Sequence, residues 1–469
     1  MTAGHHTDDG RFTSRQRYIV ITALLGLFID GFDILIVSGA LLGLVPAMGL
    51  SPGQVGLVSA GAFAGMVAGS LASGPLTDRF GRRIVFFGDM LLFIVSSALM
   101  FFAETPAQLI VLRVLAGVAI GADMPAALAM IAEFSPRARR GTVLALGNAF
   151  WPAGFVVAGA LSIVVYQFAD PAQAWRYLLM TPLVPAAVLV FLRREVPESP
   201  RWLLSRGRTE EAHRVFEECG FPAAVGETPP PTGSRPGLSS LLRRGRPRTL
   251  LLLVSAFWLV SNIVGSAILI YTPTVIKTVA KGGVFTPLVF ATVVNVVVVV
   301  VNVATSLWVV DRAGRRPLAI VPSVVVAFAL IAVAAASGNP IVIATGFAVV
   351  SIATSGMLAG VYYAWGSELF ATGIRGRSLA ITNAIGKLGS VAGVALFPTL
   401  FIAAPAISFA VLAVVVFAVV AALIRWAPET KGRSLDELEY LGAGEIPVEP
   451  AGDPFQPVDP GPRRAAGRE

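Results

Sequence analysis

Several ionisable residues lie inside otherwise apolar stretches of the chain, where a charge is costly unless it is paired or hydrated. Asp33 and Arg113 are the most informative pair, because a carboxyl group can bind a proton whereas a guanidinium does not release one. Protonation of an aspartate that is paired with an arginine would break the ion pair and permit a rearrangement. These residue types therefore point to proton coupling, with a static ion pair between two helices as the alternative.

A second group of polar residues is expected near the middle of these stretches, roughly 14 to 18 Å from their cytoplasmic ends. It comprises Asp30, Asp123 and Lys387. Lys387 could receive the carboxylate of a bound substrate, or it could instead neutralise Asp30 or Asp123. Asn262 and Tyr362 join them as candidate substrate-binding residues, because an uncharged hydrogen-bonding group in hydrocarbon needs a partner.

The composition places all of these residues in a membrane. The chain has 469 residues, of which 55% are hydrophobic and only 14% charged, and its mean hydropathy is +0.76. Twelve apolar stretches are each long enough to cross a hydrocarbon core of about 30 Å at about 1.5 Å per residue. They span residues 18–46, 52–73, 84–103, 107–134, 142–167, 176–192, 249–276, 286–310, 318–337, 340–366, 378–401 and 406–425. We therefore predict an all-α membrane protein with twelve transmembrane helices.

Depth along these helices decides which acidic and basic residues can meet. Counting residues from the expected helix ends puts Asp33 and Arg113 within about 10 Å of the same depth, so the two can pair. Asp89 lies only about 8 Å from the cytoplasmic end of its helix, which favours a place in a network of loop charges.

Three short motifs occur twice, in the same order and roughly 230 residues apart, which indicates an internal duplication. The pairs are Asp78-Arg79-Phe80-Gly81-Arg82-Arg83 with Asp311-Arg312-Ala313-Gly314-Arg315-Arg316, Glu133 and Arg140 with Glu368 and Arg375, and Pro197-Glu198-Ser199 with Pro428-Glu429-Thr430. We therefore predict two six-helix bundles related by pseudo-two-fold symmetry, with substrate handled between them.

The charged residues of these motifs are expected to form ion-pair clusters at the cytoplasmic ends of the bundles. The candidate gate residues are Asp78, Arg82, Arg83, Glu133, Arg140, Asp311, Arg315, Arg316, Glu368 and Arg375. Such clusters would close the inner side in an outward-open state and break in an inward-open one. Each surface pair contributes under about 1 kcal/mol, so the gate has to act as a network.

The distribution of basic residues predicts the orientation in the membrane. If the N-terminus is cytoplasmic, most of the 36 lysines and arginines fall on the cytoplasmic side, which is the positive-inside bias. We expect a multi-pass protein of the inner (plasma) membrane with both termini in the cytoplasm. The expected segments are a cytoplasmic tail (1–17), the first bundle (18–192), a cytoplasmic linker (193–248) with a soluble helix from Thr209 to Cys219, the second bundle (249–426) and a partly disordered cytoplasmic tail (427–469).

With the helices and the duplicated motifs in place, residues 15–440 resemble the major facilitator superfamily. The strongest match is Gly74 to Arg83, which is similar to the loop between the second and third helices of that superfamily. Pro197 to Trp202 and Pro428 to Ser434 resemble motifs of sugar porters, whereas Asp30-Gly31-Phe32-Asp33 is similar to aromatic-acid/proton symporters. The resemblance implies the twelve-helix fold and, from the sugar porters, an aspartate of the first helix opposite an arginine of the fourth.

The function that follows is proton-coupled uptake of a small polar metabolite, either a sugar or polyol or an organic acid, by alternating access between the bundles. A proton-driven exporter of drugs or metabolites and a nutrient sensor without transport activity are the alternatives. An enzyme is not expected, since no phosphate-binding glycine loop occurs and the three histidines lack metal-site spacing. No cofactor, metal or nucleic acid is expected, and the expected partners of the monomer are its substrate, protons and the bilayer.

Overall fold

The computed structural model describes residues 12–136, 139–220, 246–280, 283–336, 338–370 and 375–431, and the regular structure in these ranges is helical. Twelve helical spans within them are long and apolar enough to cross a membrane. The predicted all-α fold with twelve transmembrane helices is therefore confirmed. Most of the two expected tails and the later part of the expected linker lie outside the described residues.

The first half of the chain forms one bundle of six spans. Its helices are α1 (Ser14–Met48), α2 (Pro52–Phe80), α3 (Arg82–Met100), α4 (Pro106–Phe134), α5 (Arg140–Phe168) and a sixth span divided into α6 (Pro171–Met180) and α7 (Leu183–Arg193). Helices α1, α2 and α4 begin at capping boxes, in which Thr13, Ser51 and Thr105 bond a glutamine three residues later. Capping satisfies main-chain N–H groups that the first helical turn leaves without partners.

The second half repeats this arrangement with two irregular spans. Its elements are α11 (Arg246–Ala280), α12 (Phe285–Ala304), the π-helix η1 (Thr305–Val309), α13 (Val310–Ala313), α14 (Arg315–Ala335), α15 (Pro340–Ser351), the π-helix η2 (Ile352–Leu358), α16 (Ala359–Glu368), α17 (Arg375–Ala403) and α18 (Pro405–Trp426). Between the halves lie the short helices α8 (Pro200–Ser205) and α9 (Thr209–Glu218). Helix α9 coincides with the soluble helix expected from the sequence.

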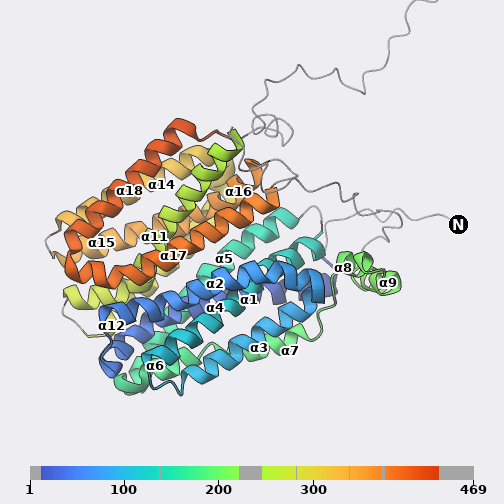
Figure 1. The fold of residues 1–469 in the computed structure, drawn as a ribbon, viewed down its shortest axis with the longest axis horizontal. Helices are drawn as coiled ribbons and strands as arrows, with labels where there is room; N and C mark the ends of the chain where they lie inside the picture. Colours follow the sequence, from blue (N-terminus) through green and yellow to red (C-terminus); the bar gives the residue numbers. More distant parts are fainter. Residues whose placement is uncertain are drawn as a thin grey trace, which may run out of the picture.

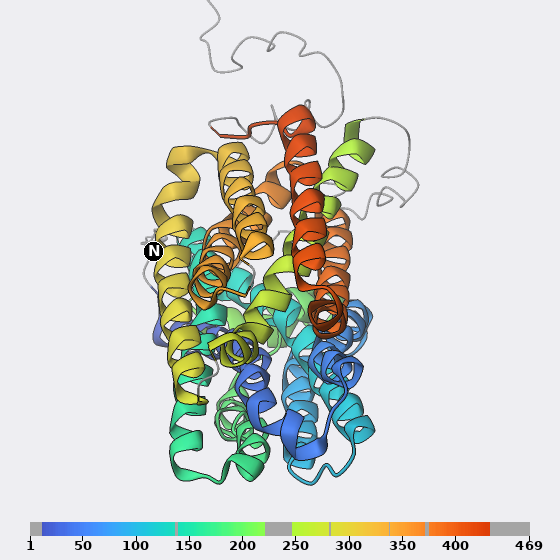
Figure 2. The same cartoon turned by 90° about the vertical axis from the view of Figure 1, so that its left-hand side faces the viewer.

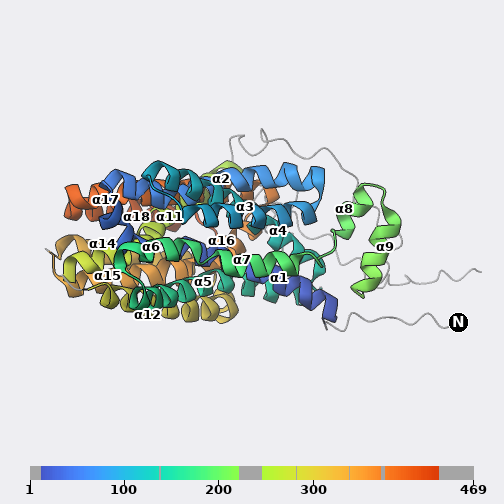
Figure 3. The ribbon, with the colours of Figure 1, turned by 90° about the horizontal axis from the view of Figure 1, so that it is seen from below.

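The helices of the two halves are grouped separately in space. In Figure 1 the first-half helices, coloured blue to green, lie together beside the second-half helices, coloured yellow-green to red. Figure 2 shows the same separation from another side. Helices α8 and α9 project beyond one end of the bundles (Figure 3). The same end carries Arg82 at the start of α3 and Arg315 at the start of α14. We call it the charged end, and we call the other end of the bundles the opposite end.

The two bundles contact each other mainly through α2 with α17, α5 with α12 and α1 with α11. Several of these contacts lie toward the opposite end. A Cβ atom at Gly56, near the start of α2, would collide with the main-chain carbonyl of Ala395 in α17. The Ser38 hydroxyl of α1 donates a hydrogen bond to the carbonyl of Ile270 in α11. The opposite end is therefore where the halves are pressed together.

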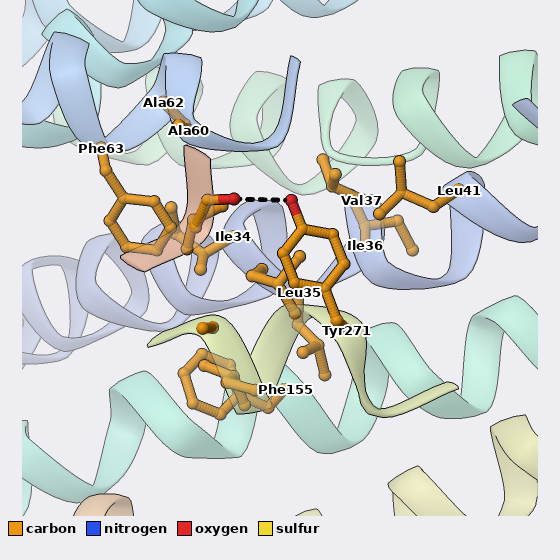
Figure 4. Packing of buried hydrophobic residues seen from close by; sticks show 14 of the residues in the cluster. Ile34, Leu35, Ile36, Val37, Leu41, Ala60, Ala62, Phe63, Phe155 and Tyr271 are labelled. Carbon is orange, nitrogen blue, oxygen red and sulfur yellow. Dashed lines mark hydrogen bonds between the residues drawn. The ribbon is translucent and has the colours of Figure 1, made fainter. Parts of the chain in front are cut away.

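Apolar side chains fill the interface between α1, α5 and α11. Figure 4 shows Tyr271 of α11 among Leu35 and Ile36 of α1, with Phe155 of α5 nearby. The Tyr271 hydroxyl donates a hydrogen bond of 2.9 Å to the main-chain carbonyl of Val394 in α17. The hydroxyl is thus satisfied although the ring is buried, which allows a tyrosine in an otherwise apolar core.

Glycines allow α2 and α4 to approach closely within the first bundle. A Cβ atom at Gly117 would collide with the main chain of Ala62, and one at Gly65 would collide with that of Val114. Close backbone approach at small residues is a common basis of helix association in membranes, where apolar side chains gain little by leaving lipid.

Gly117→Val is therefore expected to lower the thermal stability of the purified protein, by about 1–3 kcal/mol if it behaves as other overpacked sites do. Gly88→Val is the matched control, because Gly88 is also within a transmembrane helix and a Cβ atom there meets open space. Thermal unfolding in detergent measures both variants. Equal unfolding temperatures would contradict the close packing of α2 on α4.

Candidate functional site

A cavity of about 710 Å³ lies between the two bundles. It reaches the charged end, where Asp311 and Arg315 are among its lining residues. Deeper in, the first bundle contributes Leu27, Met124, Asn148, Trp151 and Phe155, and the second contributes Trp258, Asn262, Asn302, Tyr362, Asn383, Lys387 and Ser390. Because the bundles are pressed together toward the opposite end, the cavity is accessible from the charged end.

Lys387 is the charged residue that lies deep in this cavity, away from the charged end, among the lining residues that the structure describes. Its Nζ atom lies 5.1 Å from the centroid of the Trp151 ring, a cation–π distance. Trp151 belongs to α5 and Lys387 to α17, so the contact joins the two bundles. Asp30 acts on Lys387 electrostatically, but the two do not form one of the ion pairs found within the described residues.

Asn262 and Tyr362 line the same cavity, as expected of substrate-binding candidates. The Asn262 amide donates a hydrogen bond of 2.8 Å to the carbonyl of Trp258 and accepts one of 3.1 Å from the Ser390 hydroxyl. The Tyr362 ring lies 4.8 Å from that of Trp258, and its hydroxyl is hydrogen-bonded to Ser261. Together they give the second-bundle side of the cavity an aromatic surface edged with neutral polar groups.

Asp33 and Arg113 form an ion pair inside the first bundle. The Arg113 Nη1 atom lies 2.8 Å from Asp33 Oδ2, and each side chain is only 1% exposed. The pair joins α1 to α4, at the position that depth along the helices predicts. Removing one partner from such a buried pair leaves an uncompensated charge, which is strongly unfavourable.

The structure corrects the expectations for Asp123, Asp89 and Asp30. Asp123 does not line the cavity but pairs with Arg193 at the end of α7, at 2.7 Å. Asp89 is buried beside the same guanidinium, at 3.2 Å, and so does not belong to the loop charges. Asp30 is also buried behind the cavity wall. The predicted linker begins at Arg193, so this cation was expected outside the membrane. The sequence therefore offered no basic partner for Asp89 and Asp123.

At the charged end, the first two motifs of the first half join the third. Glu198 accepts hydrogen bonds from the main-chain N–H groups of Arg82 and Arg83, at 2.8 and 3.1 Å, and thereby caps α3. Arg82 also forms an ion pair with Glu133, whose other oxygen accepts a bond of 2.6 Å from the Ser199 hydroxyl. Gly81 precedes α3 with a φ of 93°, which favours glycine.

The second half repeats every one of these contacts. Glu429 accepts hydrogen bonds from the N–H groups of Arg315 and Arg316, at 3.0 and 3.1 Å. Arg315 pairs with Glu368 at 2.8 Å, and Glu368 accepts a bond from the Thr430 hydroxyl. Gly314 takes the place of Gly81, with a φ of 88°. Glu198 and Glu429 were not among the candidate gate residues, although their duplication was the signal that could have identified them.

The gate expected from these residues needs correction. The pairs of Arg82 with Glu133 and of Arg315 with Glu368 each lie within one bundle, and they are intact although the cavity is open at this end. They therefore fasten each bundle to itself and do not need to break for the cavity to open.

The remaining candidate gate residues are less involved or not described. Arg83 and Arg316 donate to the carbonyls of Arg194 and Ile424, again within one bundle. The Asp78 side chain is exposed, and Asp311 pairs with Arg315 one turn further on. The side chains of Arg140 and Arg375 lie outside the described residues.

Two π-helical segments shape the second-bundle side of the cavity and were not predicted. Ser306 of η1 and Thr354 and Ser355 of η2 line the cavity. The Asn302 amide of α12 donates a hydrogen bond of 3.0 Å to the carbonyl of Ser355. π-Helical turns often occur at functional sites because they alter the local hydrogen-bond ladder.

Two six-helix bundles around a cavity that opens at one end define a membrane transporter of the major facilitator type. The chain belongs to the family of sugar (and other) transporters, whose profile matches residues 19–441. The protein is accordingly a multi-pass membrane transporter and not an enzyme.

Individual relatives agree with this assignment. The chain is 30% identical to the inner membrane metabolite transport protein YgcS of Escherichia coli (strain K12), over 89% of this chain and 91% of YgcS. It is 29% identical to the arabinose-proton symporter of Bacillus subtilis (strain 168), over 90% of this chain and 94% of the symporter. The xylose transporter XylE from E. coli, in a partially occluded inward-open conformation, has the same fold, with a TM-score of 0.76, 22% identity and coverage of 90% of this chain and 100% of XylE.

Glu429 supplies a pH-dependent test of the capping contacts. Burial alone would raise its pKa, but the main-chain N–H groups of Lys431, Arg315, Arg316 and Thr430 lower the pKa below its usual value. A carboxyl group with a lowered folded-state pKa stabilises the protein above its unfolded pKa of about 4.3, and this contribution is lost as the pH falls through the folded-state value.

We therefore expect Glu429→Gln to unfold at a lower temperature than the wild type at neutral pH, with the difference shrinking as the pH falls below about 4. Glu210→Gln, at an exposed position of α9, is the matched control. Thermal unfolding across a pH series measures the effect. A difference that is the same at every pH would contradict the charge-assisted cap.

Proposed function

We propose that this transporter takes up a small polar metabolite, either a sugar or polyol or an organic acid, together with protons. The observation that carries the proposal is the buried Asp33–Arg113 pair, because it sets a proton acceptor beside a permanent cation inside a transporter. The charged end is cytoplasmic in the inner (plasma) membrane, with both termini on that side, so the structure corresponds to an inward-open state. One chain works as a monomer, since its own two bundles enclose the cavity.

Protonation of Asp33 would couple to the movement of the bundles through α1. This helix contacts α4 of its own bundle and α11 of the other, and Ser38, which bonds Ile270 of α11, lies little more than one turn beyond Asp33. A proton on Asp33 cancels the attraction to Arg113 and frees α1 to shift. In the present state the pair is intact, which corresponds to the stage after the proton has been released to the cytoplasm.

The cavity lining supports a polar cargo. Amide groups of Asn148, Asn262, Asn302 and Asn383, and hydroxyl groups such as that of Ser390, line a space of about 710 Å³ together with Lys387. Neutral groups of this kind can bond the hydroxyls of a sugar or polyol, and Lys387 can bond a carboxylate. The similarity to an arabinose-proton symporter supports both the proton coupling and a hydrophilic cargo.

Asp33→Asn is expected to abolish accumulation of cargo driven by a proton gradient, while exchange of cargo across the membrane remains measurable. The amide cannot carry the proton, but it still occupies the same volume. Uptake and counterflow in proteoliposomes with an imposed gradient measure the two activities for a panel of sugars, polyols and organic acids. Glu210→Gln, which alters an exposed acid of α9 outside the cavity lining, should still accumulate. Full accumulation by Asp33→Asn would eliminate the proposed role of Asp33.

Lys387→Gln is expected to raise the KM for an acidic cargo by about 10- to 100-fold, because a hydrogen bond to a charged group contributes about 1.5–3 kcal/mol. Transport of a neutral polyol should change far less. Uptake of an acid and of its matched alcohol compares the two directly, with the exposed Arg425→Gln as a control for lost positive charge at the charged end. An unchanged KM for every transported acid would remove the carboxylate role of Lys387.

A further inference from the structure

A group of buried charges that the coupling pair does not use lies behind the cavity wall of the first bundle. Arg193 of α7 lies 2.7 Å from Asp123 of α4 and 3.2 Å from Asp89 of α3. The guanidinium also stacks 3.4 Å from the ring centroid of Phe86 and donates a bond of 2.7 Å to that residue's carbonyl. The Arg193 and Asp123 side chains are fully buried.

Helix α1 brings a third carboxyl group to this place. Gly26 faces Arg193 and Asp123 so closely that a Cβ atom there would collide with both side chains. Asp30 lies four residues later, on the same face of the helix, and it interacts electrostatically with Asp123, Asp89 and Arg193. We call Asp30, Asp89, Asp123 and Arg193 the buried acid cluster.

The charges of the buried acid cluster do not balance. Three carboxylates face one guanidinium, and the cost of an uncompensated buried ion is several kcal/mol. The other charged groups that act on Asp30 are Asp33, one turn along α1 and already paired, and Lys387 across the cavity. Lys387 is held at the Trp151 ring and forms no ion pair with Asp30 within the described residues. At least one carboxyl group of the cluster must therefore be neutral.

Asp30 is the member without a compensating contact. It is 1% exposed, and neither of its carboxyl oxygens has a hydrogen-bond partner within the described residues. Asp89 and Asp123, in contrast, lie within ion-pair distance of Arg193. The two oxygens of Asp123 also lack hydrogen-bond partners within the described residues, but Asp123 lies 2.7 Å from Arg193, whereas Asp30 forms no ion pair there. A buried carboxylate with neither a donor nor a cation at ion-pair distance is the least stable of the three, so a proton is held most favourably on Asp30.

We propose that Asp30 carries a second proton in the inward-open state, at a site separate from the Asp33–Arg113 pair. The neighbours of this site connect it to the cavity, since Leu27 and Trp151 line the cavity and the main chain of Trp151 packs directly on Gly31. Protonated Asp30 leaves Arg193 with the two carboxylates that it contacts, and reduces the excess negative charge of the cluster by one.

Infrared difference spectroscopy of the purified full-length protein tests this directly, because a carboxylic acid has a C=O stretching band that a carboxylate lacks. On a step from neutral to alkaline buffer, the wild type should lose such a band. Asp30→Asn should lack it, Asp33→Asn should retain it, and Asp30→Glu should keep it at a shifted frequency. Asp30→Asn is expected to fold, since no hydrogen bond to Asp30 is lost, and size-exclusion chromatography checks this.

Two results would overturn the second proton site. One is a wild-type spectrum without a carboxylic-acid band that responds to the alkaline step. The other is a band of full amplitude in Asp30→Asn, which would assign the proton to another residue. The measurement needs neither cargo nor a gradient, so its failure leaves the proposed transport function and the role of Asp33 to be judged by uptake alone.

Discussion

Charge held away from water is the constraint on which this structure depends. Among the described residues, the buried charged side chains all belong to the first bundle: Asp30, Asp33, Asp89, Arg113, Asp123 and Arg193. Each would cost several kcal/mol without compensation, and all but Asp30 lie within ion-pair distance of an opposite charge. The second bundle instead presents amides, hydroxyls and Lys387 to the cavity. On the proposed function, the first bundle handles protons and the second binds most of the cargo.

The duplication seen in the sequence is retained where the helices meet the charged end and is lost inside the membrane. Glu198 and Glu429 cap corresponding helices, and Ser199 and Thr430 bond corresponding glutamates. These contacts satisfy main-chain groups that every such corner of the fold exposes, so both halves keep them. Inside the membrane, the halves perform different chemistry and their polar residues differ. Symmetry is thus preserved where the requirement is structural.

Much of the fold could be predicted because it depends on local properties of the chain. Span length and apolar composition identify twelve helices, and the order of the motifs identifies two halves. Depth along the helices correctly predicted that Asp33 lies near Arg113. Depth gives only how far along the helix a residue lies, and not the face of the helix that carries its side chain. Asp123 has the right height for the cavity and faces Arg193 instead. The π-helical segments that contain Ser306 and Thr354 have no residue pattern that distinguishes them from an α-helix, so they could not be predicted.

The caps at the charged end have a consequence for how the chain is divided. Glu198 follows the last span of the first half and fastens it to the corner between α2 and α3, while Glu429 does the same for its own half. Each half therefore closes its final segment back onto itself, through Glu198 in the first half and Glu429 in the second. Two separately synthesised polypeptides, divided within residues 221–245, would each retain the contacts that anchor their last membrane span, as a split carrier requires.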